Sequence, residues 1–104
     1  MDTGDKRRLE RRARMFKSLA HPVRLYFLEQ LRSGPQCVCD LAELAGVPKS
    51  AASKHLSQLK EAGLVEDQKK GVRVEYQLIA PCVLDAAVCT EKTALEVQRR
   101  RLDD

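Results

Sequence analysis

The chain has 104 residues, of which 33% are charged, 43% hydrophobic and 4% aromatic, and its formal net charge is +4 at pH 7. This length supports one modest core, which excludes a second domain, and no apolar run approaches the roughly 20 residues that a membrane span requires. The basic balance favours an anionic partner, of which nucleic acid is the commonest.

The N-terminal segment is charged and lacks the apolar region of a signal peptide. We therefore expect a cytoplasmic protein that does not enter the membrane. In that compartment the four cysteines indicate ligands or redox thiols rather than disulfides.

A first helix is predicted over residues 5–19, because Leu9, Ala13 and Phe16 recur at helical spacing. Much of its remaining surface is basic. That basic surface is either a solvated face or a face that lies near DNA phosphates.

A second helix is predicted to begin at Pro22, since proline suits the first helical position, with His21 as a possible cap. A short helix over residues 40–45 and a longer one over residues 49–62 follow, each ended by a glycine. Two short helices joined by a tight turn that contains glycine form a helix-turn-helix.

The longer helix has an apolar face, formed by Ala52, Leu56 and Leu59, that must pack inward. Its opposite side carries hydroxyl, amide and ammonium groups that can hydrogen-bond base edges and phosphates in a major groove. The predicted DNA-binding residues of this helix are Lys49, Ser50, Ser53, Lys54, Ser57 and Gln58. His55 lies nearer the buried side, where packing is its main expected role.

A hairpin is predicted next, because Val72, Val74, Tyr76 and Leu78 alternate as a half-buried strand does. Leu64 and Val65 begin its partner strand, and the Lys-Lys-Gly segment reads as the tip. A hairpin after a DNA-reading helix is a wing, so Lys69, Lys70 and Arg73 are predicted to reach phosphates. Such contacts provide affinity rather than sequence choice. The alternative is a hairpin tip that only aids solubility.

A last helix is predicted over residues 81–102, with an apolar stripe that includes Leu84, Val88 and Leu95. Little chain remains to cover this stripe, so we expect it to form a dimer interface with the first helix. The predicted fold is mainly α with a small β-hairpin, a single winged helix-turn-helix domain over residues 1–104. Its core spans residues 16–80, and its dimerisation helices span residues 5–19 and 81–102.

Cys37 and Cys39 form a C-x-C pair just before the helix-turn-helix. On a regular helix two such residues lie about 200° apart and cannot hold one ion, whereas in an extended segment they point the same way. A shared ion would therefore constrain the helix start at residues 38–41 and re-aim the DNA-reading helix. The alternative is two semi-buried free cysteines.

Cys82 and Cys89 lie on one face of the last helix but roughly 10 Å apart along it. Thiolates that share an ion, with bonds of about 2.3 Å, must lie within about 4 Å of each other. The predicted metal site is therefore Cys37 and Cys39 with either Cys82 or Cys89, from the same or the partner protomer. If the helix start unwinds, both can join. Soft thiolates without an imidazole favour a thiophilic ion.

Three stretches, "LAHPVRLYFLEQL", "CVCDLAELAGVPKSAASKHLSQLKEAGLV" and "KKGVRVEYQL", resemble the ArsR/SmtB family of winged-helix repressors over residues 16–78. The resemblance implies a homodimer that represses a detoxification operon and releases double-stranded operator DNA when an inducer binds. The C-V-C-D-L box is typical of the family's arsenite, antimonite, cadmium and lead sensors. The family's third cysteine is replaced here by Ala42, so its pattern carries over to Cys37 and Cys39 only.

We prefer As(III) or Sb(III) as the inducer. The Cd(II) and Pb(II) sensors take extra cysteines from an N-terminal arm, which has none here, and the Zn(II) sensors use histidines on a last helix that here has none. Redox or persulfide sensing through a dithiol is the alternative within the family. We expect no enzyme, because a thioredoxin-like enzyme would need a C-x-x-C motif in a βαβ context. A dimerisation module without DNA binding is disfavoured by the basic residues of the helix and the wing.

Overall fold

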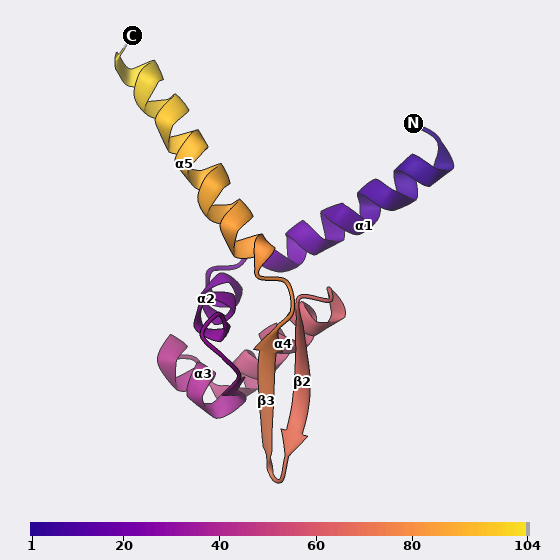
Figure 1. Cartoon of the computed structure of the whole chain (residues 1–104), viewed down its shortest axis with the longest axis vertical. Coiled ribbons are helices and arrows are strands. Elements are labelled where there is room, and N and C mark those ends of the chain that lie inside the picture. The colour runs from indigo at the N-terminus through magenta and orange to yellow at the C-terminus, as the bar shows by residue number, and fades with distance from the viewer. Residues whose placement is uncertain (104) are drawn as a thin grey trace.

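The computed structural model describes residues 1–103 as five helices and three short strands (Figure 1). In chain order these are α1 (Thr3–Leu19), α2 (Pro22–Leu31), β1 (Gln36–Cys37), α3 (Val38–Ala45), α4 (Lys49–Glu61), β2 (Val65–Lys70), β3 (Arg73–Leu78) and α5 (Cys82–Asp103). The helices α2, α3 and α4 and the sheet form a body, from which α1 and α5 project as two arms (Figure 1).

The core lies between the three body helices and the sheet. Phe27, Leu28, Leu41 and the predicted apolar face of α4 are fully buried, with Ala52, Leu56 and Leu59 each 0% exposed. Apolar burial of this kind is the main stabilising term in folding. It holds α4 by one face and leaves the opposite face free.

Two helix starts follow from local capping. The side chain of Asp2 accepts a hydrogen bond from the backbone N–H of Asp5, so α1 begins at Thr3, two residues before the predicted start. The Nδ1 atom of His21 accepts a hydrogen bond from the N–H of Val23 at 3.1 Å, which confirms the predicted cap before Pro22.

The sheet has three antiparallel strands in the order β1-β3-β2, one more than the predicted hairpin. In β1, Gln36 pairs with Tyr76 and Cys37 with Glu75. A strand of two residues is too short to show alternation in a sequence, which is why pattern reading missed it. The prediction that Val72 belongs to a half-buried strand was wrong, because this residue is 99% exposed at the hairpin tip. The tip is a two-residue turn in which Gly71 has a φ of 64°.

The arms carry apolar side chains that the body does not cover. Phe16 is 61% exposed on α1, and Val88 and Leu95 are 53% and 57% exposed on α5. Leu84, expected in the same stripe, instead joins the core of its own chain with 4% exposure. The Cα radius of gyration is 16.4 Å, against about 13 Å for a compact domain of this length. No helix within residues 1–103 is long and apolar enough to cross a membrane.

Candidate functional site

The helix-turn-helix places one face of α4 on the surface. The first helix, α3, ends at Gly46, which adopts a left-handed conformation with a φ of 67°. The N–H of Val47 then bonds the carbonyl of Ala42, and α4 begins after Pro48. Five predicted DNA-binding residues of α4 are exposed and one, Ser53, is half-buried; the exposed five are Lys49, Ser50, Lys54, Ser57 and Gln58. The structure thus presents the whole predicted set on one accessible helix.

His55 lies on the side of α4 that faces α2, as the sequence predicted. Its Nδ1 atom accepts a hydrogen bond of 3.0 Å from Nε of Arg24, and its ring centroid lies 4.3 Å from that of His21. Partial burial, followed by the nearby charges of His21, Arg24 and Lys54, lowers the pKa of His55 below its ordinary value. A neutral His55 therefore acts as an acceptor that positions Arg24.

The basic residues of the wing differ in their contacts. Lys69 is exposed on β2, whereas Nζ of Lys70 lies 3.4 Å from a carboxylate oxygen of Glu75. Arg73 turns toward the body: its Nη2 atom lies 2.9 Å from Sγ of Cys37 and 3.5 Å from a carboxylate oxygen of Asp40. Of the three wing residues predicted to contact phosphates, Arg73 thus contacts residues at the start of α3 instead.

Cys37 is the residue that caps α3. It is 3% exposed, and its Sγ atom accepts hydrogen bonds from the backbone N–H of Asp40 at 3.4 Å and from Arg73. The hydrogen bond to Cys37, followed by the charges of Cys37 and Asp40, raises the pKa of Arg73. Arg73 could not be linked to the thiol from the sequence, because the pairing of β1 with β3 brings Cys37 beside it. The contact with Asp40 is local, since Asp40 follows Cys37 by three residues at the start of α3.

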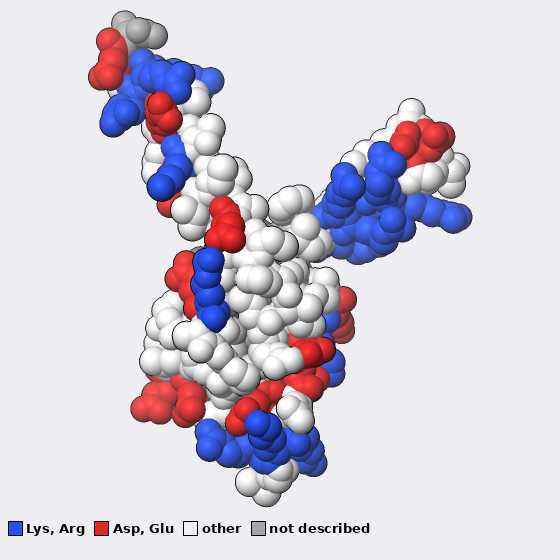
Figure 2. Space-filling view, viewed as in Figure 1, with Lys and Arg blue, Asp and Glu red and all other residues white. Residues whose placement is uncertain are grey.

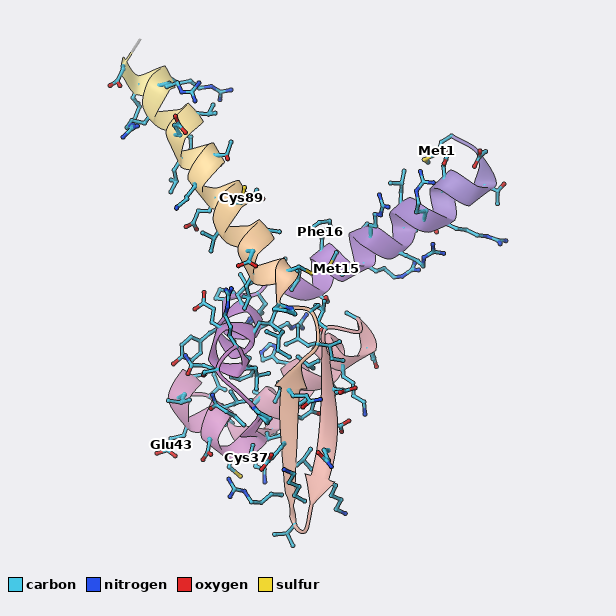
Figure 3. The ribbon with its side chains drawn as sticks, viewed as in Figure 1. Met1, Met15, Phe16, Cys37, Glu43 and Cys89 are labelled. Atoms are coloured by element: carbon cyan, nitrogen blue, oxygen red, sulfur yellow. The ribbon has the colours of Figure 1, made fainter. Side chains whose placement is uncertain are left out.

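The other three predicted ligands differ from Cys37 in being exposed. Helix α3 begins at Val38, two residues earlier than predicted, so Cys39 lies inside the helix and is exposed while Cys37 is buried. Cys82 and Cys89 are exposed on α5. Figure 3 shows Cys89 on the projecting arm and Cys37 at the far side of the body. Among the described residues no group of three or more Cys, His, Asp or Glu side chains could hold a metal ion.

A basic groove that the sequence analysis did not single out lies between α1 and α4, with a volume of about 980 Å³. Its lining includes Arg11, Arg14, Lys17, Arg24, Lys54, Ser57, Gln58 and Glu61. The basic character of α1 was visible in the sequence. The contribution of Arg24 was not, because it depends on how α2 packs against α4.

Three comparisons with known proteins bear on this arrangement. Residues 21–67 match the family model described as bacterial regulatory protein, arsR family. The HTH-type transcriptional repressor SmtB of Mycobacterium tuberculosis is 35% identical over 91 residues, which cover 84% of this chain and 67% of that protein. The arsenic resistance transcriptional regulator ArsR1 of Pseudomonas putida is 40% identical over 65 residues, which cover 62% of this chain and 51% of that protein.

A solved structure is similar over nearly the whole chain. It is the solution structure of a homodimeric winged helix-turn-helix DNA-binding domain from Mycobacterium bovis, a possible ArsR-family transcriptional regulator, with a TM-score of 0.78 and 29% identity. The match covers 96% of this chain and 93% of that one. These likenesses confirm the predicted winged helix-turn-helix, and the relatives named here are transcriptional regulators rather than enzymes.

Proposed function

Because the chain belongs to the ArsR family of bacterial regulatory proteins, we propose that it is a cytoplasmic, homodimeric repressor that releases operator DNA when As(III) or Sb(III) binds Cys37 and Cys39. The observation that carries this proposal is the position of Cys37. The thiol caps the first helix of the helix-turn-helix and at the same time holds the wing through Arg73.

The donor set suits a thiophilic ion, since it offers thiols without a nearby imidazole. The geometry does not yet suit chelation, because Cys37 is buried and Cys39 is exposed. One ion can bind both sulfurs only if the first turn of α3 unwinds and turns Cys37 outward. Such a movement removes the cap from Asp40, at a cost of about 1 kcal/mol, and draws the buried side chain of Val38 out of the core. The helix that supports α4 is thereby disturbed.

The same movement reaches the wing. Arg73 loses its sulfur acceptor when Cys37 binds an ion, so β3 loses a direct link to the start of α3. Both DNA-contacting parts, α4 and the wing, then change position relative to each other. An ion that binds the moved conformation more tightly than the DNA-binding conformation shifts the protein toward the moved one. Binding at the pair of thiols thereby lowers the affinity for DNA.

The third ligand is proposed to be Cys82 or Cys89 of the partner subunit, or a thiol or hydroxide from solution. Within one chain Cys89 lies on the projecting arm, away from Cys37 (Figure 3). The homodimer is supported by the exposed apolar residues of α1 and α5 and by the homodimeric relative from Mycobacterium bovis. Cd(II), Pb(II) and Zn(II) remain candidates for the same site.

The test counts reactive thiols on reduced, anaerobic protein with and without stoichiometric arsenite, while a duplex from upstream of the protein's own coding region reports binding. The thiol reaction is run to completion, because Cys37 is 3% exposed and reacts only as the start of α3 opens. We expect two thiols per protomer, those of Cys37 and Cys39, to be lost together with DNA affinity; a third lost thiol identifies the α5 ligand. If all four thiols stay reactive, the proposed inducer is wrong. Loss of DNA binding under oxidant or persulfide, and not under arsenite, would instead assign the protein to the dithiol redox sensors.

A further inference from the structure

Helix α1 has two opposed faces. Arg11 stands two residues after Leu9, and Arg14 stands two residues before Phe16, so each arginine points about 200° away from an apolar residue. Leu9 and Phe16 are 43% and 61% exposed, and they form the face that we assign to the dimer interface. The arginine face is therefore left free by dimerisation.

The arginine face lies over α4. Arg11, Arg14 and Lys17 of α1 form one wall of the groove between α1 and α4, and Lys54 of α4 belongs to the other wall. Arg24 of α2 also lines the groove. In Figure 2 the basic side chains of α1 cover the side of the helix that is turned toward the body. Glu61 is the single carboxylate among the lining residues.

Among residues 1–103 these five cations form no salt bridge. Within residues 1–103 none of them lies within 4.0 Å of a carboxylate oxygen, whereas Lys60, Lys70 and Arg73 on neighbouring elements are all paired with acids. Arg24 is held in place, since it donates to the carbonyl of Ser18 at 3.1 Å and to Nδ1 of His55 at 3.0 Å. Because no carboxylate neutralises them, the positive charges that line the groove repel one another. An anion bound in the groove would reduce that repulsion.

We propose that this α1–α4 groove binds the phosphate backbone of DNA beside the major groove that α4 enters, an inference that rests on the proposed DNA-binding function. Lys54, Ser57 and Gln58 belong both to the DNA-reading side of α4 and to the groove, so the two surfaces are continuous. Arg7 extends the basic row by one further turn of α1. One strand of a duplex carries a phosphate for about every 3.4 Å of helix axis, so a row of cations along α1 can face several phosphates of the same strand.

The experiment measures DNA affinity against salt concentration for the metal-free dimer, on a random-sequence duplex and on the fragment from upstream of the coding region. The variant is Arg11→Gln with Arg14→Gln, and the control is Arg99→Gln with Arg101→Gln, which removes the same charge from the far end of α5. Each lost phosphate contact lowers the slope of log K against log [salt] by about 0.9, so we expect the variant's slope to fall by about 1.8 per protomer. The control should keep the slope of the unaltered protein, and affinity should fall equally on both duplexes.

A variant slope equal to that of the control overturns the proposal for the groove and leaves DNA binding by α4 and the wing intact. If the unaltered protein shows no salt-dependent binding, the proposed function itself fails. Sedimentation velocity confirms that each variant remains a folded dimer. Should the double variant dissociate, Lys17→Gln tests the same wall with one charge, and an unchanged slope there also overturns the proposal.

Discussion

Replacing Cys37 by serine separates its two roles, the cap of α3 and the proposed inducer ligand. Serine is among the best N-cap residues, and its hydroxyl can accept from both donors that now reach the sulfur, the N–H of Asp40 and the guanidinium of Arg73. An oxygen cannot replace a thiolate toward a thiophilic ion. We therefore expect Cys37→Ser to bind DNA as the unaltered protein does and to lose its response to arsenite.

Cys37→Ala measures how much the cap contributes to stability, because it removes the cap as well as the thiol. Loss of an N-cap acceptor costs about 0.5–2 kcal/mol. For a domain of this size 1 kcal/mol corresponds to a melting temperature lower by about 4–8 °C. Thermal unfolding followed by circular dichroism should therefore place the melting temperature of Cys37→Ala about 2–16 °C below that of Cys37→Ser.

Cys39→Ser is the matched control for both measurements, the melting temperature and the response of DNA binding to arsenite. Its side chain is exposed and caps nothing, so the melting temperature should stay unchanged while the response to arsenite is lost. DNA binding with and without arsenite is measured by fluorescence anisotropy on all three variants. Release of DNA by arsenite from Cys37→Ser would refute the role of this thiol. Loss of DNA binding by Cys37→Ser and Cys39→Ser before arsenite is added would refute the separation of the two roles.

Three further predictions concern the dimer, pH and the core. Phe16→Glu should weaken the dimer about 10²-fold or more in sedimentation experiments, since each of two symmetric copies loses about 1.5–3 kcal/mol of apolar burial; an unchanged dimer would contradict the assigned interface. The pKa of His55 is lower in the folded protein than its unfolded value of about 6.5, so the free energy of unfolding should be constant above that pH and fall as pH drops through it. Denaturant titrations should show a smaller fall for His55→Gln, and an identical pH profile would rule out this linkage. Leu56→Ala, at a fully buried position, should lower the free energy of unfolding by about 2–5 kcal/mol in urea, and a loss below about 1 kcal/mol would mean that α4 is not anchored there.

The position of Arg73 links Cys37, the proposed inducer ligand, to the wing. Read from the sequence, Arg73 and Lys70 are equivalent cations at a hairpin tip. In the fold Arg73 bonds the buried thiol, and Lys70 lies beside Glu75. Arg73 is therefore suited to report the state of Cys37 to the wing.

The sequence by itself determined the elements and the family. Proline at the first helical position identified α2, helical spacing identified α4 and α5, and alternation identified β3. The apolar face of Ala52, Leu56 and Leu59 was correct residue by residue. These features depend on interactions within one element or on a period of several residues, which a single sequence displays. The exposed side of α4, with its predicted DNA-binding residues, followed directly from that face.

Only the tertiary structure decided which distant residues meet. The two-residue strand β1 sets Cys37 beside Arg73, and the packing of α2 on α4 sets Arg24 beside His55. It likewise placed Cys89 on the projecting arm and Cys37 at the far side of the body, whereas the sequence left open which cysteine of the last helix meets the pair. Such contacts arise from the burial of a shared core and from strand pairing between segments far apart in the chain. Periodicity within a segment carries no information about them.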